Sequence, residues 1–246
     1  MRKITALVLA ACLSIPWIGS AAFADESSNT VVLNTYFEED FNSVETGGTT
    51  SSFEEYVLGS NKIYVAENPD AADKSLCFDS VGASSKSSCR AVLNTGRAEG
   101  SIAVDFKVCL TGESNEFRIY VVSYTVGEKY LAKIIGTNLM TPSGSIVAPL
   151  TPGVFYPVTI IIHTETSTAD YYVNNRKKVS GVQFFDKNLE AFDLLRFYQF
   201  NTDTAQTRTY IDDVRVYESE RPASEYLTMG KTVKYEINPS SSPLAS

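Results

Sequence analysis

The amino-acid sequence predicts an all-β protein in which two antiparallel sheets pack face to face as a β-sandwich. Apolar and polar residues alternate with a period of two rather than 3.6 along most of the chain. β-Branched and aromatic residues dominate these segments, and the 246 residues include 14 Tyr and 13 Phe. Since each such strand has one apolar face, two sheets must pack together to bury those faces.

The predicted strands extend over about residues 31–218 and repeat one pattern. In Ser101–Cys109, for example, Ile102, Val104 and Phe106 alternate with Ala103, Asp105 and Lys107, which lie on the opposite face. The predicted strands are, in chain order, Tyr36–Phe41, Lys74–Ser80, Ser88–Asn94, Ser101–Cys109, Glu116–Tyr124, Pro157–Thr166, Ala169–Asn174, Leu194–Phe200 and Arg208–Glu218.

Turn-forming residues separate the strands, as in Thr151-Pro152-Gly153 and Asn174-Asn175. Two short segments, Asp186–Leu195 and Ala223–Met229, are the helix candidates. We see no internal repeat, and the length suits one large all-β domain, which we assign to residues 25–219. Residues 220–246 contain a run of Ser and Pro and are predicted to form a linker or flexible tail.

The N-terminus has the pattern of a secretory signal peptide. Arg2 and Lys3 precede the apolar run Ile4–Ile18, and Ala22-Phe23-Ala24 is a small-x-small cleavage site. We therefore expect residues 1–24 to be removed and the mature protein to be secreted. The alternative is lipoprotein processing at Cys12, although the apolar stretch continues beyond that residue. No later segment approaches the roughly 20 apolar residues of a membrane helix.

Oxidising surroundings outside the cytoplasm favour disulfides. Cys77 and Cys89 lie in neighbouring predicted strands with a Ser-rich loop between them. A hairpin would bring them close, and we predict a Cys77–Cys89 disulfide that leaves Cys109 unpaired. In the alternative interpretation all three cysteines are buried thiols.

Charge and composition limit two classes of function. The formal net charge is −8, so the chain lacks the excess of cations that nucleic-acid binding requires. It has one His and four Cys, one of which lies in the predicted signal peptide. The remaining one His and three Cys are too few for more than one four-ligand Cys/His zinc site.

Three segments resemble the concanavalin A-like lectin/glucanase superfamily, the jelly-roll group that includes laminin G-like modules. The first is Tyr36–Phe41, an opening strand that ends in Asp-Phe. The second is Tyr156–Val179, which is similar to the family hairpin whose turn carries Asn-Gly, although this chain has Asn174-Asn175 there. The third is Tyr210–Tyr217, which looks like the closing strand of the family. The resemblance implies a jelly-roll fold and fixes no activity.

The resemblance also implies a structural calcium site where the first and last strands meet. If Val214 and Val216 face the core, alternation places Asp212 on the same side, and a buried carboxylate needs a partner. Asp40 and Glu39 of the opening strand would complete a set of hard oxygen ligands for Ca²⁺. The alternative is that Asp212 accepts backbone N–H groups at a strand end.

The sequence does not contain the paired carboxylates of the glucanase branch, which follow a Glu-x-Asp-x-x-Glu spacing. The lyase branch abstracts a proton with Tyr or His and neutralises a uronate with Arg. A concave sheet could gather Arg118, Tyr120, His163, Arg196 and Tyr198 for such chemistry. However, the Gln-x-His and Tyr-x-Lys-x-Gly signatures of jelly-roll alginate lyases are missing. A lyase acting on polyuronates is therefore the less favoured alternative.

We accordingly expect a non-catalytic module that binds carbohydrate or another ligand of the cell envelope. Tyr faces would stack on sugar rings, and side chains of the concave sheet would add hydrogen bonds. The candidate ligand-binding residues are Arg118, Tyr120, Tyr124, His163, Arg196 and Tyr198. An adhesion or scaffold protein with a protein ligand, as in laminin G-like modules, is the alternative from a different class.

Overall fold

The computed structural model of the chain describes residues 31–68, 73–80, 87–112, 114–201, 206–218 and 233–237. The predicted signal peptide, Cys12 and the helix candidate Ala223–Met229 lie outside these residues. Within them all regular secondary structure is β-strand. None of the described segments forms a helix long and apolar enough to cross a membrane.

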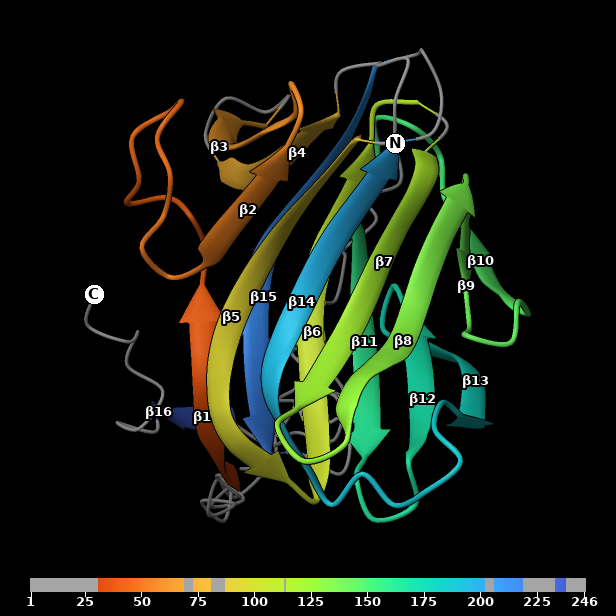
Figure 1. Ribbon diagram of the computed structural model, residues 1–246. Helices are drawn as coiled ribbons and strands as arrows, with labels where there is room; N and C mark the ends of the chain where they lie inside the picture. The colour runs from red at the N-terminus through yellow and green to blue at the C-terminus, as the bar shows by residue number, and fades with distance from the viewer. Residues whose placement is uncertain are drawn as a thin grey trace, which may run out of the picture.

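The strands form two sheets that face each other, as predicted (Figure 1). Sheet A contains, in spatial order, β13 (Arg176–Gln183), β12 (Thr168–Val173), β11 (Tyr156–His163), β6 (Ser101–Leu110), β15 (Thr207–Glu218), β1 (Val31–Glu39) and β16 (Val233–Ile237). Two further strands extend this sheet from one end of β15: β4 (Lys74–Ser80), which pairs with β15, and β3 (Lys62–Glu67), which pairs with β4. Sheet B contains β10 (Ile146–Pro149), β9 (Asn138–Met140), β8 (Gly127–Gly136), β7 (Ser114–Ser123), β14 (Ala191–Asn201), β5 (Ser87–Glu99) and β2 (Glu54–Leu58).

The two ends of the predicted sandwich meet in sheet A. β1 pairs antiparallel with β15, and Glu39 lies opposite Val214. Strand β16 then pairs with β1 in parallel, with Val31 opposite Val233. The sequence analysis did not identify β16, because it assigned residues 220–246 to a linker. The alternation Val233, Tyr235, Ile237 was the signal for this short strand.

Between the sheets lies one hydrophobic core whose centre is aromatic. Phe197 of β14 is fully buried. Its ring centroid lies 5.6 Å from Phe106 of sheet A and 6.2 Å from Phe117 of sheet B. Phe53, in the loop before β2, lies 6.4 Å away. The core residues of each strand alternate with outward residues, so the period of two observed in the sequence has its physical origin here.

The predicted hairpin after β11 is confirmed. β12 and β13 are joined by Asn174 and Asn175, whose φ angles are 51° and 59°. Two consecutive positive φ angles define the two-residue type I′ turn, which matches the twist of the flanking strands, and Asn adopts this conformation at little cost. The Asn-Asn pair therefore performs the role that Asn-Gly has in the family that the sequence resembles.

The helix predicted over Asp186–Leu195 is wrong, because β14 begins at Ala191. The pairing of β14 with β5 shifts register between Phe192 and Leu194. This bulge separates the buried residues Phe192 and Leu195 by three positions rather than two. A spacing of three apolar positions resembles one turn of a helix, which explains the error.

The predicted Cys77–Cys89 disulfide is also wrong, since Cys77, Cys89 and Cys109 are buried free thiols. The expected hairpin does not form: Cys77 lies on β4 of sheet A and Cys89 on β5 of sheet B. Cys89 belongs to the hydrophobic core between the sheets, whereas Cys77 does not. The alternative interpretation, three buried thiols, is the one that the structure supports.

Candidate functional site

Four of the six candidate ligand-binding residues come together on the outer face of sheet B. Arg118 and Tyr120 lie on β7, and Arg196 and Tyr198 lie on the neighbouring β14. In the antiparallel register Tyr198 is opposite Arg118 and Arg196 is opposite Tyr120. Because residues two apart in a strand point to the same side, all four side chains project from the face opposite the core.

Side chains from β2, β5, β8 and β14 extend this group across the sheet. The sequence analysis missed Tyr56 of β2, Arg90 of β5, Tyr130 of β8 and Phe200 of β14. We call the complete set the tyrosine–arginine face; it contains Tyr56, Arg90, Arg118, Tyr120, Tyr130, Arg196, Tyr198 and Phe200. In Figure 1 the strands that carry these residues form the front sheet.

The rings of this face contact one another across strands. The ring centroid of Tyr120 lies 5.3 Å from that of Tyr130 and 6.4 Å from that of Tyr198. The centroids of Tyr198 and Phe200 are 3.9 Å apart. The spacing of these four rings makes a continuous aromatic surface over three adjacent strands.

Guanidinium groups lie among the rings. The Cζ atom of Arg118 lies 4.4 Å from the centroid of Phe200, and its Nη1 donates to the hydroxyl of Tyr120 at 2.9 Å. Glu116 accepts from Nε of Arg118 at 2.7 Å, and this hydrogen bond raises the pKa of Arg118. The Cζ atom of Arg90 lies 4.3 Å from the ring centroid of Tyr56. These contacts fix the guanidinium groups in place.

Several polar atoms of this face have no hydrogen-bond partner. They are the hydroxyl of Tyr130, Nε of Arg90 and Nε of Arg196. Arg196 does pair with Glu128 through Nη1, and its side chain is only 13% exposed. Beside Arg90 there is a pocket of about 250 Å³, lined in part by Tyr56, Ser88 and Tyr198. These three atoms are buried, so a ligand would contact the arginines through their terminal nitrogens rather than through Nε.

The tyrosines of this face are hydrogen-bond donors rather than bases. Burial raises the pKa of Tyr120, and the hydrogen bond from Arg118 offsets this only in part. Burial also raises the pKa of Tyr130. A general base needs a pKa near the working pH, and these two phenols therefore stay protonated at neutral pH.

The other two candidates lie elsewhere. Tyr124 follows β7 in a turn and is 71% exposed, and its backbone N–H donates to Asp193 at 2.8 Å. His163 ends β11, which belongs to sheet A, so the expectation that it joins Arg118 and Tyr120 is wrong. The alternation of apolar and polar residues predicts which side chains of a strand point outward. It does not predict to which of the two sheets the strand belongs.

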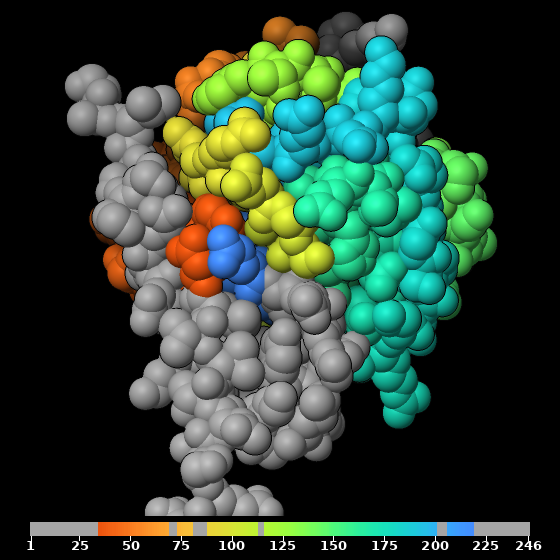
Figure 2. All heavy atoms as spheres, turned by 90° about the horizontal axis from the view of Figure 1, so that it is seen from below, coloured from red at the N-terminus to blue at the C-terminus, as the bar shows by residue number. Residues whose placement is uncertain are grey.

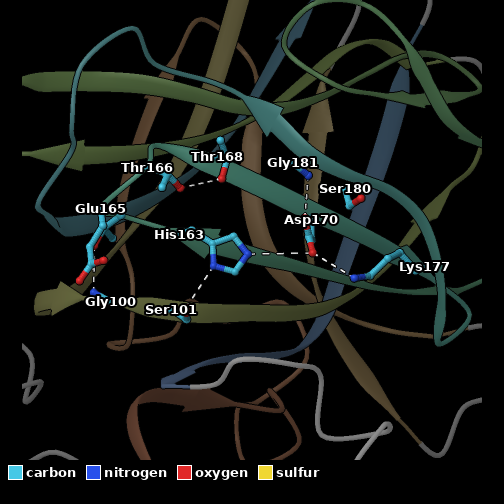
Figure 3. A pocket seen from close by; sticks show the side chains of 11 residues that line it. Gly100, Ser101, His163, Glu165, Thr166, Thr168, Asp170, Lys177, Ser180 and Gly181 are labelled. Carbon is cyan, nitrogen blue, oxygen red and sulfur yellow. Dashed lines mark hydrogen bonds and ion pairs between the residues drawn. The ribbon is translucent and has the colours of Figure 1, made fainter.

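His163 instead lines a polar pocket of about 560 Å³ on the outer face of sheet A (Figure 3). Its Nδ1 lies 3.1 Å from the hydroxyl of Ser101 on β6, and its Nε2 lies 4.0 Å from a carboxylate oxygen of Asp170 on β12. Strand pairing places these residues together, because His163 is opposite Ser101 in β6 and Thr168 in β12.

These three residues do not have the geometry of a nucleophilic triad. The distance of 4.0 Å between His163 and Asp170 is too long for a hydrogen bond. Asp170 is satisfied instead by Lys177 at 3.1 Å and by the backbone N–H of Gly181 at 2.7 Å. The nearby N–H of Gly100, which an oxyanion hole would need, donates to Thr164.

The predicted calcium residues are placed by a β-bulge. The pairing of β15 with β6 shifts register between Asp212 and Arg215, and Asp213 has a φ of 48°. This extra residue reverses the alternation, so Asp212 lies on the outer face opposite Lys107, not on the side of Val214. The expectation that Asp212 faces the core is therefore wrong, although its side chain is fully buried.

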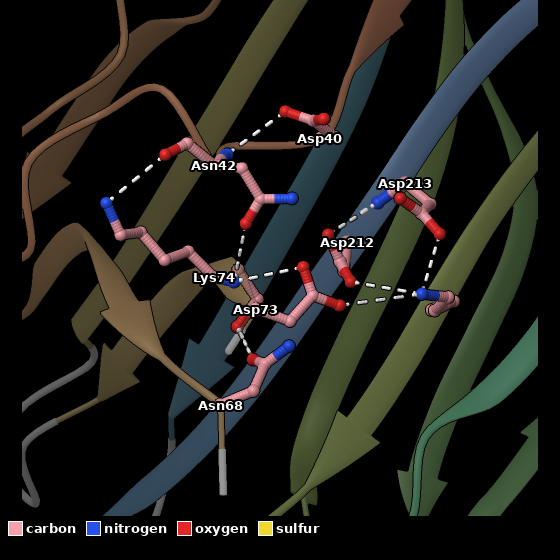
Figure 4. A network of polar contacts seen from close by, with 9 residues as sticks. Asp40, Asn42, Asn68, Asp73, Lys74, Asp212 and Asp213 are labelled. Carbon is pink, nitrogen blue, oxygen red and sulfur yellow. Dashed lines mark hydrogen bonds and ion pairs between the residues drawn. The ribbon is translucent and has the colours of Figure 1, made fainter. Parts of the chain in front are cut away.

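A lysine lies where the sequence suggested a metal ion. Nζ of Lys107 is 2.6 Å from Asp213, 3.4 Å from Asp212 and 3.7 Å from Asp73. Asp212 also accepts the backbone N–H of Asp213 at 2.8 Å, which is the alternative that the sequence left open. Figure 4 shows Asp73, Asp212 and Asp213 converging from neighbouring segments.

Glu39 and Asp40 turn toward their own loop. Glu39 accepts the backbone N–H of Phe41 at 2.9 Å, and Asp40 accepts that of Asn42 at 3.0 Å. Across the described ranges no group of three or more His, Cys, Asp or Glu side chains is arranged to hold a metal ion. The set Asp40, Glu39 and Asp212 thus does not converge as one ligand group, and calcium binding stays a prediction.

The buried carboxyl of Asp212 and the half-buried carboxyl of Glu55 predict how stability depends on pH. Burial, with the nearby charge of Asp213, raises the pKa of Asp212 to about 7, and burial raises the pKa of Glu55 to about 7. In the unfolded chain both titrate near pH 4, as model carboxyls do. Between about pH 4 and 7 the folded state binds more protons, so these groups make the free energy of unfolding fall as pH rises.

We therefore expect thermal unfolding at a higher temperature at pH 5 than at pH 8, as measured by circular dichroism. Asp212→Asn and Glu55→Gln would each reduce this difference. Asp186→Asn, at an exposed position in the loop before β14, is the matched control and would leave it unchanged. An equal difference in all four proteins would contradict the assignment.

No family model matches the chain, and no curated protein matches it. Solved structures do match. A sialidase is similar over 76% of this chain with a TM-score of 0.61 and 10% identity, and this chain spans only 19% of the sialidase. Domain 4 of AbnA, an extracellular arabinanase from Geobacillus stearothermophilus solved with arabinotriose, is similar over 81% of this chain and 99% of its own length, with a TM-score of 0.51 and 15% identity.

An endo-β-1,4-glucuronan lyase from the fungus Trichoderma reesei is similar over 72% of this chain and 96% of its own, with a TM-score of 0.50 and 12% identity. Structural matches at sequence identities this low show a shared fold but do not show a shared activity. The order of strands, the pairing of β1 with β15 and these matches agree. The chain has a concanavalin A-like jelly-roll fold, and its structural neighbours are concanavalin A-like jelly-roll proteins.

Proposed function

We propose that the chain is a non-catalytic module that binds carbohydrate through the tyrosine–arginine face. The observation that carries the proposal is the unbroken surface of Tyr120, Tyr130, Tyr198 and Phe200 with guanidinium groups fixed between the rings. Aromatic faces stack on sugar rings, and the phenol and guanidinium donors can bond the hydroxyl groups at the ring edge. The matching domain of AbnA was solved with arabinotriose, which supports the ligand class.

The charges of the face favour a sugar that bears a carboxylate. Arg90, Arg118 and Arg196 gather here although the chain as a whole has a formal net charge of −8. Glu116 and Glu128 neutralise Arg118 and Arg196. Arg90 makes no ion pair with any described residue. We therefore propose that a sugar carboxylate binds beside Arg90, next to Tyr198.

A glycan array that includes polyuronates and neutral polysaccharides tests the proposal. Tyr120→Ala and Tyr198→Ala are each expected to weaken binding about tenfold, because a lost stacking contact of about 1–1.5 kcal/mol corresponds to that factor. Arg90→Gln is expected to weaken binding to polyuronates more than binding to neutral glycans. Tyr124→Ala removes an exposed tyrosine outside the face and serves as the control.

Absence of binding to every glycan would contradict the proposal. Lyase activity is tested separately: a lyase would increase the absorbance of unsaturated products when it is incubated with polyuronates. We expect a flat trace, because burial raises the pKa of Tyr120 and of Tyr130, so that neither phenol is a ready base at neutral pH. His163, the single histidine of the chain, lies on the other sheet.

A protein ligand is the second candidate, and one feature favours it. Strand β2 is the edge of sheet B, and it exposes Tyr56, Val57 and Leu58 by 41%, 47% and 61%. Apolar side chains on an edge strand offer a surface for another chain. A glycan array without any binding signal would favour this candidate. Leu58→Lys would then be expected to abolish binding to the protein ligand.

A further inference from the structure

The pocket around His163 is a second candidate binding site, on the sheet opposite the tyrosine–arginine face. We propose that it binds a neutral polyhydroxylated ligand, a single sugar unit or a similar polyol, through a hydroxyl group held between His163 and Asp170. It has a volume of about 560 Å³. Its lining residues are Gly100, Ser101, His163, Thr164, Glu165, Thr166, Thr168, Asp170, Lys177, Ser180 and Gly181.

The pocket lies where two β-turns meet at one end of the sandwich. Gly100 connects β5 and β6, and residues 164–167 connect β11 and β12. The backbone N–H of Thr164 donates to the carbonyl of Gly100 at 3.0 Å, and the N–H of Gly100 donates to the hydroxyl of Thr164 at 2.9 Å. Figure 2 views this end, where the yellow segment near residue 100 and the blue-green segment near residue 165 lie side by side. Reciprocal bonds of this kind make the wall of the pocket rigid.

The two groups that would recognise the ligand are held in place before it binds. Ser101 fixes His163 through Nδ1 at 3.1 Å. The backbone N–H of Gly181 and the ammonium of Lys177 fix the two carboxylate oxygens of Asp170 at 2.7 and 3.1 Å. Preorganised polar groups lose little conformational freedom on binding, which favours affinity.

The distance between His163 and Asp170 is the observation that suggests a bridging hydroxyl. Nε2 of His163 and Oδ2 of Asp170 are 4.0 Å apart, too far for a direct hydrogen bond. An oxygen atom about 2.8 Å from each, the usual length of such a bond, fits between them. A hydroxyl group can donate to Asp170 while it accepts from His163. Lys177, whose side chain is 50% exposed, can donate to the adjacent hydroxyl of the same ligand.

The lining chemistry points to a neutral ligand. Asp170 and Glu165 carry two negative charges against the one positive charge of Lys177, so an anionic sugar would be repelled. The remaining polar side chains are hydroxyls; those of Thr166 and Thr168 bond each other at 2.8 Å. No Tyr, Phe or Trp side chain lines this pocket. Without stacking, we expect a dissociation constant of about 1–10 mM for a monosaccharide.

The imidazole of His163 is a unique reporter, because the chain contains one histidine. We would titrate the isotope-labelled protein with methyl β-D-glucopyranoside and follow the ring signals by NMR. A saturable shift is expected, together with intermolecular NOEs between ligand protons and the ring. D-Glucuronate, the anionic counterpart, is expected to bind at least about tenfold more weakly.

Two variants test the contacts. Asp170→Asn would reduce affinity about tenfold or more, and Lys177→Met would reduce it several-fold while leaving Asp170 bound to Gly181. Tyr124→Ala, at an exposed position outside both proposed sites, is the control and would leave this titration unchanged. The NOEs keep the test decisive even where Asp170→Asn fails to fold. No shift at about 100 mM methyl glucoside, a concentration well above the expected dissociation constant, would overturn the proposal, as would equal binding of glucuronate.

The two proposals fail separately. The pocket faces away from the core on sheet A, and the tyrosine–arginine face lies on sheet B. Loss of the NMR response with intact binding on the glycan array would refute the pocket alone. The reverse result would refute the tyrosine–arginine face alone.

Discussion

Replacing Phe197 with Ala is expected to lower the free energy of unfolding by about 3–5 kcal/mol, the range found for Phe→Ala in protein cores. Phe197 is fully buried and contacts aromatic rings of both sheets, Phe106 and Phe117, and that of Phe53. These neighbours come from three different segments, and they cannot all move into the space that the ring leaves. Urea denaturation followed by fluorescence or circular dichroism measures the change.

The matched control for Phe197→Ala is Tyr124→Ala. Tyr124 is 71% exposed, and a surface substitution of this kind changes stability by less than about 0.5 kcal/mol. A loss below about 1 kcal/mol for Phe197→Ala would show that this ring is not at the centre of a packed core. Because Phe197 lies between Arg196 and Tyr198 in β14, a marginally stable variant would also lose ligand binding without any direct contact.

At pH 8, Lys107→Met is expected to lower the free energy of unfolding by about 1 kcal/mol, because Asp212, whose pKa is about 7, is ionised there and loses its cation. Nζ of Lys107 is 3.4 Å from the fully buried Asp212 and 2.6 Å from Asp213. The double variant Lys107→Met, Asp212→Asn should regain much of the loss, because the group that suffers from burial is then neutral. Thermal and urea unfolding of the wild type, both single variants and the double variant form the cycle that measures this coupling.

Additive losses of stability in that cycle would contradict the role given to Lys107.

The same unfolding measurements test the calcium prediction, because Ca²⁺ or a chelator can be added to each of these proteins without making a further variant. A chelator that lowers the melting temperature of the wild type would support the calcium prediction, and an unchanged temperature would contradict it. Lys107 already supplies one positive charge to these carboxylates.

The sequence predicted the fold because alternation, turn residues and the paired chain ends all pointed to one architecture. The β-bulges could not be predicted from the sequence. No residue pattern in Tyr210–Tyr217 indicates that Asp213 adopts a positive φ and reverses the alternation before Val214. The bulge at residues 192–194 made part of β14 look helical. A single inserted residue changes the face of every residue on one side of it, and its cost depends on tertiary contacts.

Prediction of the candidate site was limited in the same way. Arg118 and Tyr120 could be assigned to one face from β7 alone. Their neighbours Arg90 and Tyr130 come from β5 and β8, and strand order cannot be read from periodicity. His163 shows the consequence: its outward position was foreseeable, but the opposite sheet was not. The neighbours of Arg118 and Tyr120 and the sheet that contains His163 both depend on pairing between strands distant in sequence. That pairing depends on the whole core.

The absence of disulfides among the described cysteines has a practical meaning for how the protein is made. Burial raises the pKa of Cys77 to about 11, so its thiol stays protonated and unreactive at neutral pH. Because the described part of the chain contains no sulfur cross-link, it can reach the same native state in a reducing cytosol as in an oxidising medium. Preparations from either source are therefore expected to be interchangeable, without an isomerase or a glutathione couple during refolding.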